Sequence, residues 1–101
     1  MGLFSKLFGP KVDLNEVINT RNAQIIDVRS PGEFKSGHLR NSKNIPLQSL
    51  QGKVGSIKKD RPVVTCCASG MRSGQAKGML KQMGYEVYNG GSWNALRKYT
   101  S

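Results

Sequence analysis

The sequence predicts an α/β domain with a largely parallel sheet, on three observations. Short apolar runs alternate with segments of helical periodicity, and the connections between them are short. The runs over 24–28 and 62–66 are almost continuously apolar, which is typical of strands buried on both faces of a parallel sheet. The length of 101 residues fits a single domain with one modest core.

The first half of the chain is expected to form two short helices and two strands. Asp13 is placed to cap the first helix, with Glu16 three residues on. A strand over 24–28 follows, and then a capping-box pattern opens the second helix with Ser30, Pro31 and Glu33. Gly37 ends that helix, and a short strand at 44–45 leads into a helical turn near 47–50.

The second half predicts the clearest helix of the chain, over 71–83, between two strands. A strand over 62–66 precedes it, and Gly84 ends it before a strand over 85–88. One helix face carries four apolar residues at helical spacing: Ala76, Met79, Leu80 and Met83. A turn at 89–91 is expected next, and Ser92 caps a final helix.

The net charge of +10, from 16 Lys and Arg against 6 Asp and Glu, indicates a positive field that attracts small anions. The basic residues are scattered along the chain, and no basic-aromatic motif of the RNA-binding type is present. Nucleic acid is therefore not firmly implied as a partner. The sequence also indicates no metal site and no cofactor.

The two cysteines, Cys66 and Cys67, are adjacent and so cannot link distant parts of the chain. They indicate functional thiols in a reducing compartment, and we expect a cytoplasmic protein. No apolar run approaches the roughly 20 residues of a transmembrane helix. Residues 1–11 lack the features of a signal peptide and are expected to form an N-terminal tail before a domain over 12–101.

The stretch around Cys67 carries the chemistry that the sequence predicts. A strand ends at the cysteines, small residues follow, and a helix begins near Arg72. Amides at a helix start, together with the helix dipole, stabilise a thiolate and bind anions. We expect Cys67 to be the nucleophile and Arg72 to add positive charge. The anion would be bound by the loop residues Ala68, Ser69, Gly70, Met71, Arg72 and Ser73.

Several segments together resemble the rhodanese-like family of sulfurtransferases. Residues 67–73 read CASGMRS and resemble that family's C-x-x-G-x-R-S loop. Residues 25–39 are similar to its D-V-R, E-[FY] and G-H-I signature, residues 44–46 to its N-I-P turn, and residues 84–93 to its closing segment. The resemblance covers about 12–99. It implies a rhodanese-like α/β fold with a central, mostly parallel five-stranded sheet flanked by helices.

The resemblance also implies an activity. Cys67 would take sulfur from a small anionic donor such as thiosulfate, hold it as a persulfide, and pass it to cyanide, a thiol or a protein cysteine. No cofactor takes part in this chemistry. Cys66 is expected to be an inert strand residue. Asp27 and Arg29 are expected to form structural hydrogen bonds, including an Arg29–Glu33 pair.

Two other functions fit the same residues. Counting from Cys66, the spacing to Arg72 matches the C-x5-R pattern of cysteine phosphatases. The domain would alternatively be a persulfide carrier or regulatory module with little turnover of its own, because fold and loop alone do not separate a carrier from an enzyme.

Overall fold

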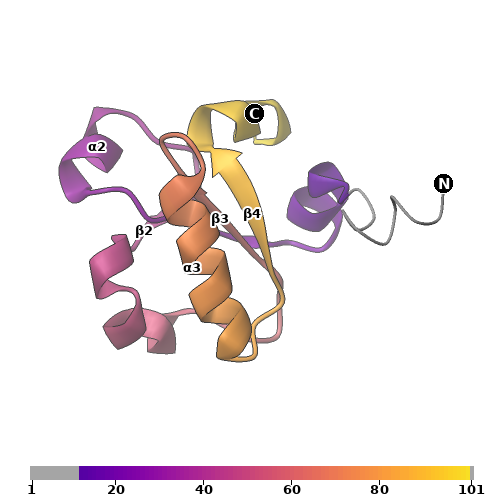
Figure 1. The fold of residues 1–101 in the computed structure, drawn as a ribbon. Coiled ribbons are helices and arrows are strands. Elements are labelled where there is room, and N and C mark those ends of the chain that lie inside the picture. Colours follow the sequence, from indigo (N-terminus) through magenta and orange to yellow (C-terminus); the bar gives the residue numbers. More distant parts are fainter. Residues whose placement is uncertain (1–11, 101) are drawn as a thin grey trace, which may run out of the picture.

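The computed structural model describes residues 12–100, and the predicted tail over 1–11 lies outside them. One sheet of four strands runs through the centre in the order β2-β1-β3-β4, and every pairing is parallel (Figure 1). Its strands are β1 (Gln24–Asp27), β2 (Lys43–Asn44), β3 (Val63–Cys67) and β4 (Val87–Ser92). The α/β class with a parallel sheet is thereby confirmed.

The helical elements fall near where the sequence predicts them, except that the helical turn expected near 47–50 continues into a further short helix, η3. In chain order they are η1 (Glu16–Thr20), α2 (Pro31–Ser36), η2 (Leu47–Ser49), η3 (Gln51–Ser56), α3 (Met71–Gln82) and η4 (Trp93–Tyr99). No helix within residues 12–100 is long and apolar enough to cross a membrane.

The sheet has four strands within residues 12–100, not the five that the resemblance implied. The reason lies at the start of the described chain. The Asp13 carboxylate accepts the amide protons of Asn15 and Glu16 at 3.0 and 3.3 Å, so the chain turns directly into a helix after Val12. Residues 12–15 therefore add no strand to the sheet.

Local capping signals set the helix ends as predicted. The Ser30 hydroxyl accepts the Glu33 amide at 3.2 Å, and the Glu33 carboxylate accepts the Ser30 amide at 3.0 Å, which completes a capping box. At the end of α3 the amides of Gly84 and Tyr85 donate to Lys81 O and Leu80 O. This is the Schellman arrangement, and Gly84 adopts its left-handed backbone at φ 92°.

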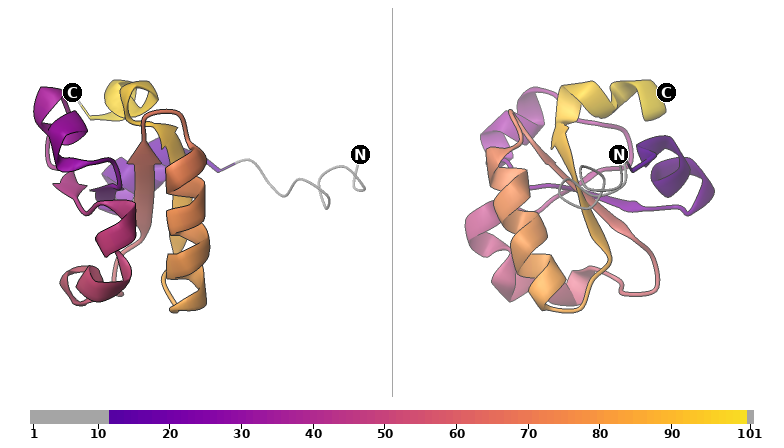
Figure 2. Two further views of the ribbon diagram at one scale, coloured as in Figure 1. Left: turned by 60° about the vertical axis from the view of Figure 1, so that its left-hand side comes forward. Right: turned by 45° about the vertical axis from the view of Figure 1, so that its right-hand side comes forward.

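Helices cover both faces of the sheet and bury two apolar clusters (Figure 2). On one face, Ala76 and Leu80 of α3 pack with Leu50 and Ile57 against the strands. On the other face, η1 and η4 contribute Val17, Ile18 and Leu96. The alternation of β3 sends Val64 and Cys66 to the second cluster and Val63 and Cys67 to the first.

The last strand differs from the prediction, because the expected turn at 89–91 lies inside β4. An irregularity between Thr65 and Cys67 lets the chain continue pairing as far as Ser92. Gly90 passes so close to its neighbours that a β-carbon there would lie 2.8 Å from Val64 and Leu96 side-chain carbons. The glycine is needed for this close approach of β4 to β3 rather than for a turn.

Candidate active site

Cys67 is the last residue of β3 and stands at the carboxyl edge of the parallel sheet. A tight loop over 68–70 connects it to the first turn of α3, and this loop lies at the same end of the molecule as α2 and η4 (Figures 1 and 2). The amides of a first helical turn have no acceptor within their own helix. The fold therefore places the Cys67 sulfur where such amides point.

The Cys67 sulfur is held by three hydrogen-bonding groups. The Gly70 amide donates to Sγ at 2.9 Å and the Ser73 amide at 3.4 Å, while Ser73 Oγ lies 3.4 Å away. Gly70 has a left-handed backbone with φ 109°, which only glycine adopts without strain and which turns its amide inward. Of the six loop residues over 68–73 that the sequence offered, Gly70 and Ser73 form the hydrogen bonds to the sulfur.

The environment of Cys67 favours the thiolate. Burial, which leaves the residue 1% exposed, acts to raise the pKa of its thiol. The hydrogen bonds from Ser73 and from the backbone amides of the loop act in the opposite direction and outweigh it, so the pKa of Cys67 is lowered from its ordinary value. A lowered thiol pKa is the physical requirement for a cysteine nucleophile at neutral pH.

Asn89 fixes the cradle from β4, and sequence reasoning missed it by assigning it to a turn. Its Oδ1 is 2.6 Å from Ser73 Oγ and accepts the Gly91 amide at 2.9 Å. Its Nδ2 donates to Gly70 O at 3.2 Å. Asn89 therefore contacts both residues that hold the sulfur. No signal in the sequence indicates this contact, because it depends on how far β4 extends.

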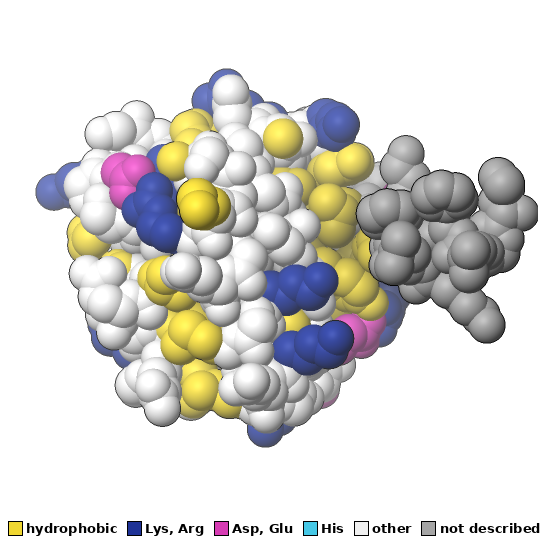
Figure 3. All heavy atoms as spheres, viewed as in Figure 1, with side chains coloured by type: hydrophobic (Ala, Val, Ile, Leu, Met, Phe, Trp, Pro, Cys, Tyr) yellow, Lys and Arg dark blue, Asp and Glu magenta, His cyan; other side chains and the backbone are white. Residues whose placement is uncertain are grey.

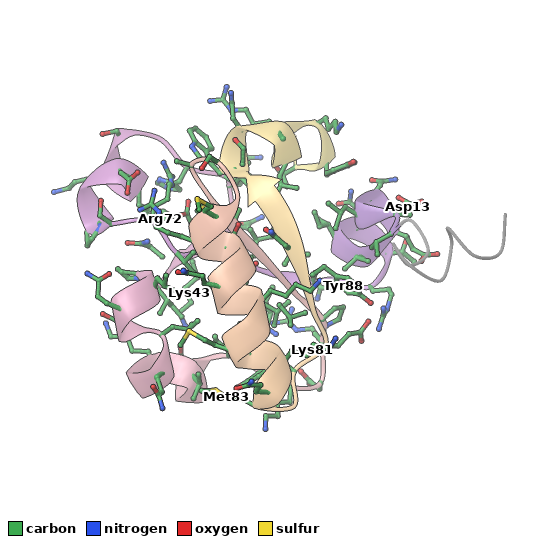
Figure 4. All side chains as sticks on the ribbon, in the orientation of Figure 1. Asp13, Lys43, Arg72, Lys81, Met83 and Tyr88 are labelled. Carbon is green, nitrogen blue, oxygen red and sulfur yellow. The ribbon has the colours of Figure 1, made fainter. Side chains whose placement is uncertain are left out.

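Arg72 points away from β3 and toward α2, as Figure 4 shows. Its Nη1 and Nη2 donate to the two carboxylate oxygens of Glu33 at 2.7 and 2.9 Å. Both side chains remain more than a third exposed. The charge of Arg72 is therefore shared with Glu33, and this ion pair ties the loop to α2.

The remaining loop residues turn their side chains to solvent. Ala68 and Ser69 are exposed, and Met71 is 82% exposed. These side chains shape the rim of the site rather than its floor.

Asp27 and Arg29 form the structural hydrogen bonds that the sequence predicts. Arg29 donates to both Asp27 oxygens at 2.8–3.0 Å and to Gly37 O at 2.6 Å. It donates to Glu33 at the backbone oxygen, at 3.2 Å, so the expected Arg29–Glu33 pair is present as a hydrogen bond to the main chain and does not involve the carboxylate. The Glu33 carboxylate is instead the partner of Arg72, because Arg29 is drawn to the fully buried Asp27.

Cys66 lies outside the cradle. Its side chain is fully buried on the opposite face of the sheet, with Val64 and Leu96. Burial raises the pKa of its thiol to about 12, and the nearby Asp27 carboxylate adds to this effect. A thiol in this position is protonated at neutral pH.

The fold and the cysteine cradle define a rhodanese-like domain, and the comparisons with known proteins agree. The sequence model described as "Rhodanese-like domain" matches residues 11–98. The chain belongs to this family.

Several relatives are similar over about two thirds of the chain. The chain is 44% identical over 70 residues to the uncharacterized protein YqhL of Bacillus subtilis, 68% of this chain and 56% of that protein. It is 36% identical over 67 residues to a sulfurtransferase of Allochromatium vinosum, 66% of this chain and 63% of that protein. It is 38% identical over 69 residues to the thiosulfate sulfurtransferase PspE of Escherichia coli, 65% and 66% of the two chains. The chain thus spans less than two thirds of the first two relatives.

Solved structures show the same fold. The reduced CoADR-RHD of Bacillus anthracis superposes with a TM-score of 0.75 at 31% identity, covering 98% of this chain and 18% of that one. A rhodanese with anions from Escherichia coli superposes with a TM-score of 0.67 at 34% identity, covering 72% and 89%.

Proposed function

We propose that this protein is a sulfurtransferase that carries sulfane sulfur as a persulfide on Cys67. The observation that supports this most directly is the cradle of Gly70 and Ser73 around the sulfur, which lowers the pKa of the thiol. The same donors suit a persulfide, because its terminal sulfur is also an anion. Relatives named thiosulfate sulfurtransferase suggest thiosulfate as the donor.

The proposed reaction has two displacement steps. The Cys67 thiolate attacks the outer sulfur of thiosulfate, a new sulfur–sulfur bond forms, and sulfite leaves with the electron pair of the broken bond. A second nucleophile, such as cyanide or a thiolate, then attacks the terminal sulfur, and Cys67 leaves as a thiolate. This is covalent catalysis by an activated nucleophile, and it needs no cofactor.

Each residue of the loop has a role in this proposal. The amides of Gly70 and Ser73 hold the sulfur, and Arg72 keeps the loop in place through Glu33. The rim residues Ala68, Ser69 and Met71 meet the donor and the acceptor. Two free, buried cysteines suit a reducing compartment, and we place the protein in the cytoplasm.

Intact-mass spectrometry after treatment with thiosulfate tests the proposal. We expect a gain of one sulfur that cyanide or a reductant removes. The gain should be absent in Cys67→Ala and present in Cys66→Ala. A wild type that gains no sulfur would contradict the proposal. A protein that gains the sulfur but does not convert cyanide to thiocyanate would instead be a persulfide carrier with little turnover.

Cys67→Ala and Cys66→Ala also distinguish a sulfurtransferase from the alternative, a cysteine phosphatase. Hydrolysis of an aryl phosphate that survives in Cys67→Ala and is lost in Cys66→Ala would assign the chemistry to Cys66. The burial of Cys66 and its raised pKa argue against that outcome.

A further inference from the structure

A long polar groove runs along the side of the molecule away from the cysteine loop. Two neighbouring hollows, of about 580 and 350 Å3, share the lining residues Asn22, Ala23, Ile25 and Asn41, and the two together are called the groove below. Most of these residues lie just before strands or at their starts, whereas Cys67 lies at the carboxyl end of β3. The groove is therefore separate from the sulfur-binding site.

The groove is lined by positive charge alone. Its lining contains five basic residues and no Asp or Glu: Arg40, Lys43, Lys58, Arg61 and Lys98. Among residues 12–100, every ion pair of the structure involves other residues, namely Arg21 with Glu86, Arg29 with Asp27 and Arg72 with Glu33. None of the five basic residues pairs with a carboxylate within residues 12–100, so the lining carries a net positive charge although Asp60 lies beside Arg61 in the sequence. Figure 3 shows the same excess of basic over acidic side chains on the face that it draws.

The backbone of the groove is also unusual. Within residues 12–100 two non-glycine residues have a positive φ, Asn22 at 56° and Asn41 at 67°, and both line both hollows. Such conformations have an energetic cost and are concentrated at functional sites. Asn15 and Asn19 add two more amide side chains to the lining.

We propose that this groove binds a single-stranded nucleic acid. Five cations that form no ion pair within residues 12–100 match a chain of phosphates, which supplies most of the affinity in such complexes. Amide side chains carry both donors and acceptors and so suit base edges and sugar hydroxyls. An acidic peptide would use the cations alone, whereas the amide side chains of the four asparagines also offer hydrogen bonds to bases and sugars. The function is independent of sulfur transfer, because the groove shares no residue with the cysteine loop.

Fluorescence anisotropy with labelled oligo(U) and oligo(dT) strands tests this proposal on the full chain. We expect binding at low salt that weakens as salt rises. The slope of log K against log salt should be no steeper than about −3.5, because each phosphate neutralised on a single strand contributes about −0.7 and the groove has five cations. Binding of both strands equally points to the phosphate backbone, and tighter binding of oligo(U) adds a contact to the 2′-hydroxyl; either outcome supports the groove.

Three double variants, which all lower the net charge by the same amount, show where the nucleic acid binds. Arg40→Glu with Lys98→Glu alters one hollow, and Lys43→Glu with Lys58→Glu alters the other. The matched control is Lys77→Glu with Lys81→Glu on α3. We expect each groove variant to bind at least about tenfold more weakly than the control, with a shallower salt slope. Circular dichroism of all three checks that the fold is kept, and the two groove variants test the proposal independently.

Three outcomes would overturn the proposal. In the first, the wild type binds neither strand at low salt. In the second, the control variant loses as much affinity as the groove variants, which would mean that net charge alone drives binding. In the third, poly-glutamate displaces the strands as effectively as unlabelled oligo(U), which assigns the groove to an acidic peptide.

Discussion

The carboxylate of Glu33 holds both terminal nitrogens of Arg72, at 2.7 and 2.9 Å, and so joins the loop around Cys67 to α2. Glu33 is itself fixed by the capping box with Ser30 at the start of α2. The loop is therefore anchored to a helix end whose geometry is set by local sequence. This gives Arg72 a positioning role that is separate from any direct contact with an anion.

Variants of this pair distinguish the two roles of Arg72. We expect Arg72→Ala to slow sulfur loading from thiosulfate several-fold, because the loop loses its anchor. Glu33→Gln keeps the guanidinium and a residue suited to the capping box, but removes the charge that holds Arg72. Similar slowing in both variants, measured by rapid-quench mass spectrometry, supports positioning. Slowing in Arg72→Ala alone would mean that the guanidinium acts on the anion directly.

Removal of the Ser73 hydroxyl should make Cys67 less reactive at neutral pH. Ser73→Ala keeps the amide that contacts the sulfur but removes Oγ, which lies 3.4 Å from Sγ. The Ser73 side chain acts to lower the pKa of Cys67, so we expect the alkylation rate at neutral pH to fall in Ser73→Ala. The pH at half-maximal rate should rise above that of the wild type. An unchanged pH profile would show that the backbone amides alone lower the pKa.

Two glycine-to-alanine substitutions should have opposite effects on stability. In Gly90→Ala the new carbon would lie 2.8–2.9 Å from Val64, Leu96 and the Thr65 carbonyl oxygen, so we expect a loss of about 1–3 kcal/mol. In Gly78→Ala nothing lies within 4 Å and the site is inside α3, so we expect a gain of about 0.5–1 kcal/mol. Urea denaturation measures both. Equal stability of Gly90→Ala and the wild type would contradict the close contact of β4 with β3.

The ion pair between Arg21 and Glu86 predicts a pH-dependent contribution to stability. Hydrogen bonds from Arg21, and then from Tyr88, lower the pKa of Glu86 from 4.5 to about 2. Because the pKa of Glu86 is lower in the folded than in the unfolded chain, its charge stabilises the fold at pH values above the unfolded-state pKa. This contribution is lost as the pH falls from about 4.5 to about 2. We expect Glu86→Gln to be less stable than the wild type near neutral pH.

The difference in stability between Glu86→Gln and the wild type should disappear near pH 2, as measured by urea denaturation at several pH values. Glu16→Gln is the control, since Glu16 forms no ion pair within the described chain. A difference that stays constant with pH would mean that Glu86 stabilises the fold by packing and not by charge.

The fold was largely predictable because its signals are local. The capping box at Ser30, the glycine at the end of α3 and the apolar strands each act within a few residues, and all are confirmed. The cysteine loop was predictable for the same reason, since Cys67, Gly70 and Ser73 lie within one short segment.

The contacts that sequence reasoning missed all join distant segments. Arg72 and Glu33 are 39 positions apart, and Ser73 and Asn89 are 16 apart. The expected turn at 89–91 was wrong because the close approach of Gly90 to β3 depends on tertiary packing. The cations of the groove are likewise scattered over 40–98 in the sequence, so only the fold brings them together.

Cys66 and Cys67 point to opposite faces of the sheet, and this affects how a persulfide on Cys67 can be discharged. Adjacent α-carbons lie about 3.8 Å apart across a trans peptide, closer than the roughly 4.4–6.8 Å of most disulfides, and here the two side chains also point to opposite faces of the sheet. The chain has no other cysteine. On the proposed function, discharge of a sulfur from Cys67 is therefore bimolecular: a loaded molecule would keep its sulfur until an acceptor arrives, and the acceptor's concentration would set the lifetime of the loaded state.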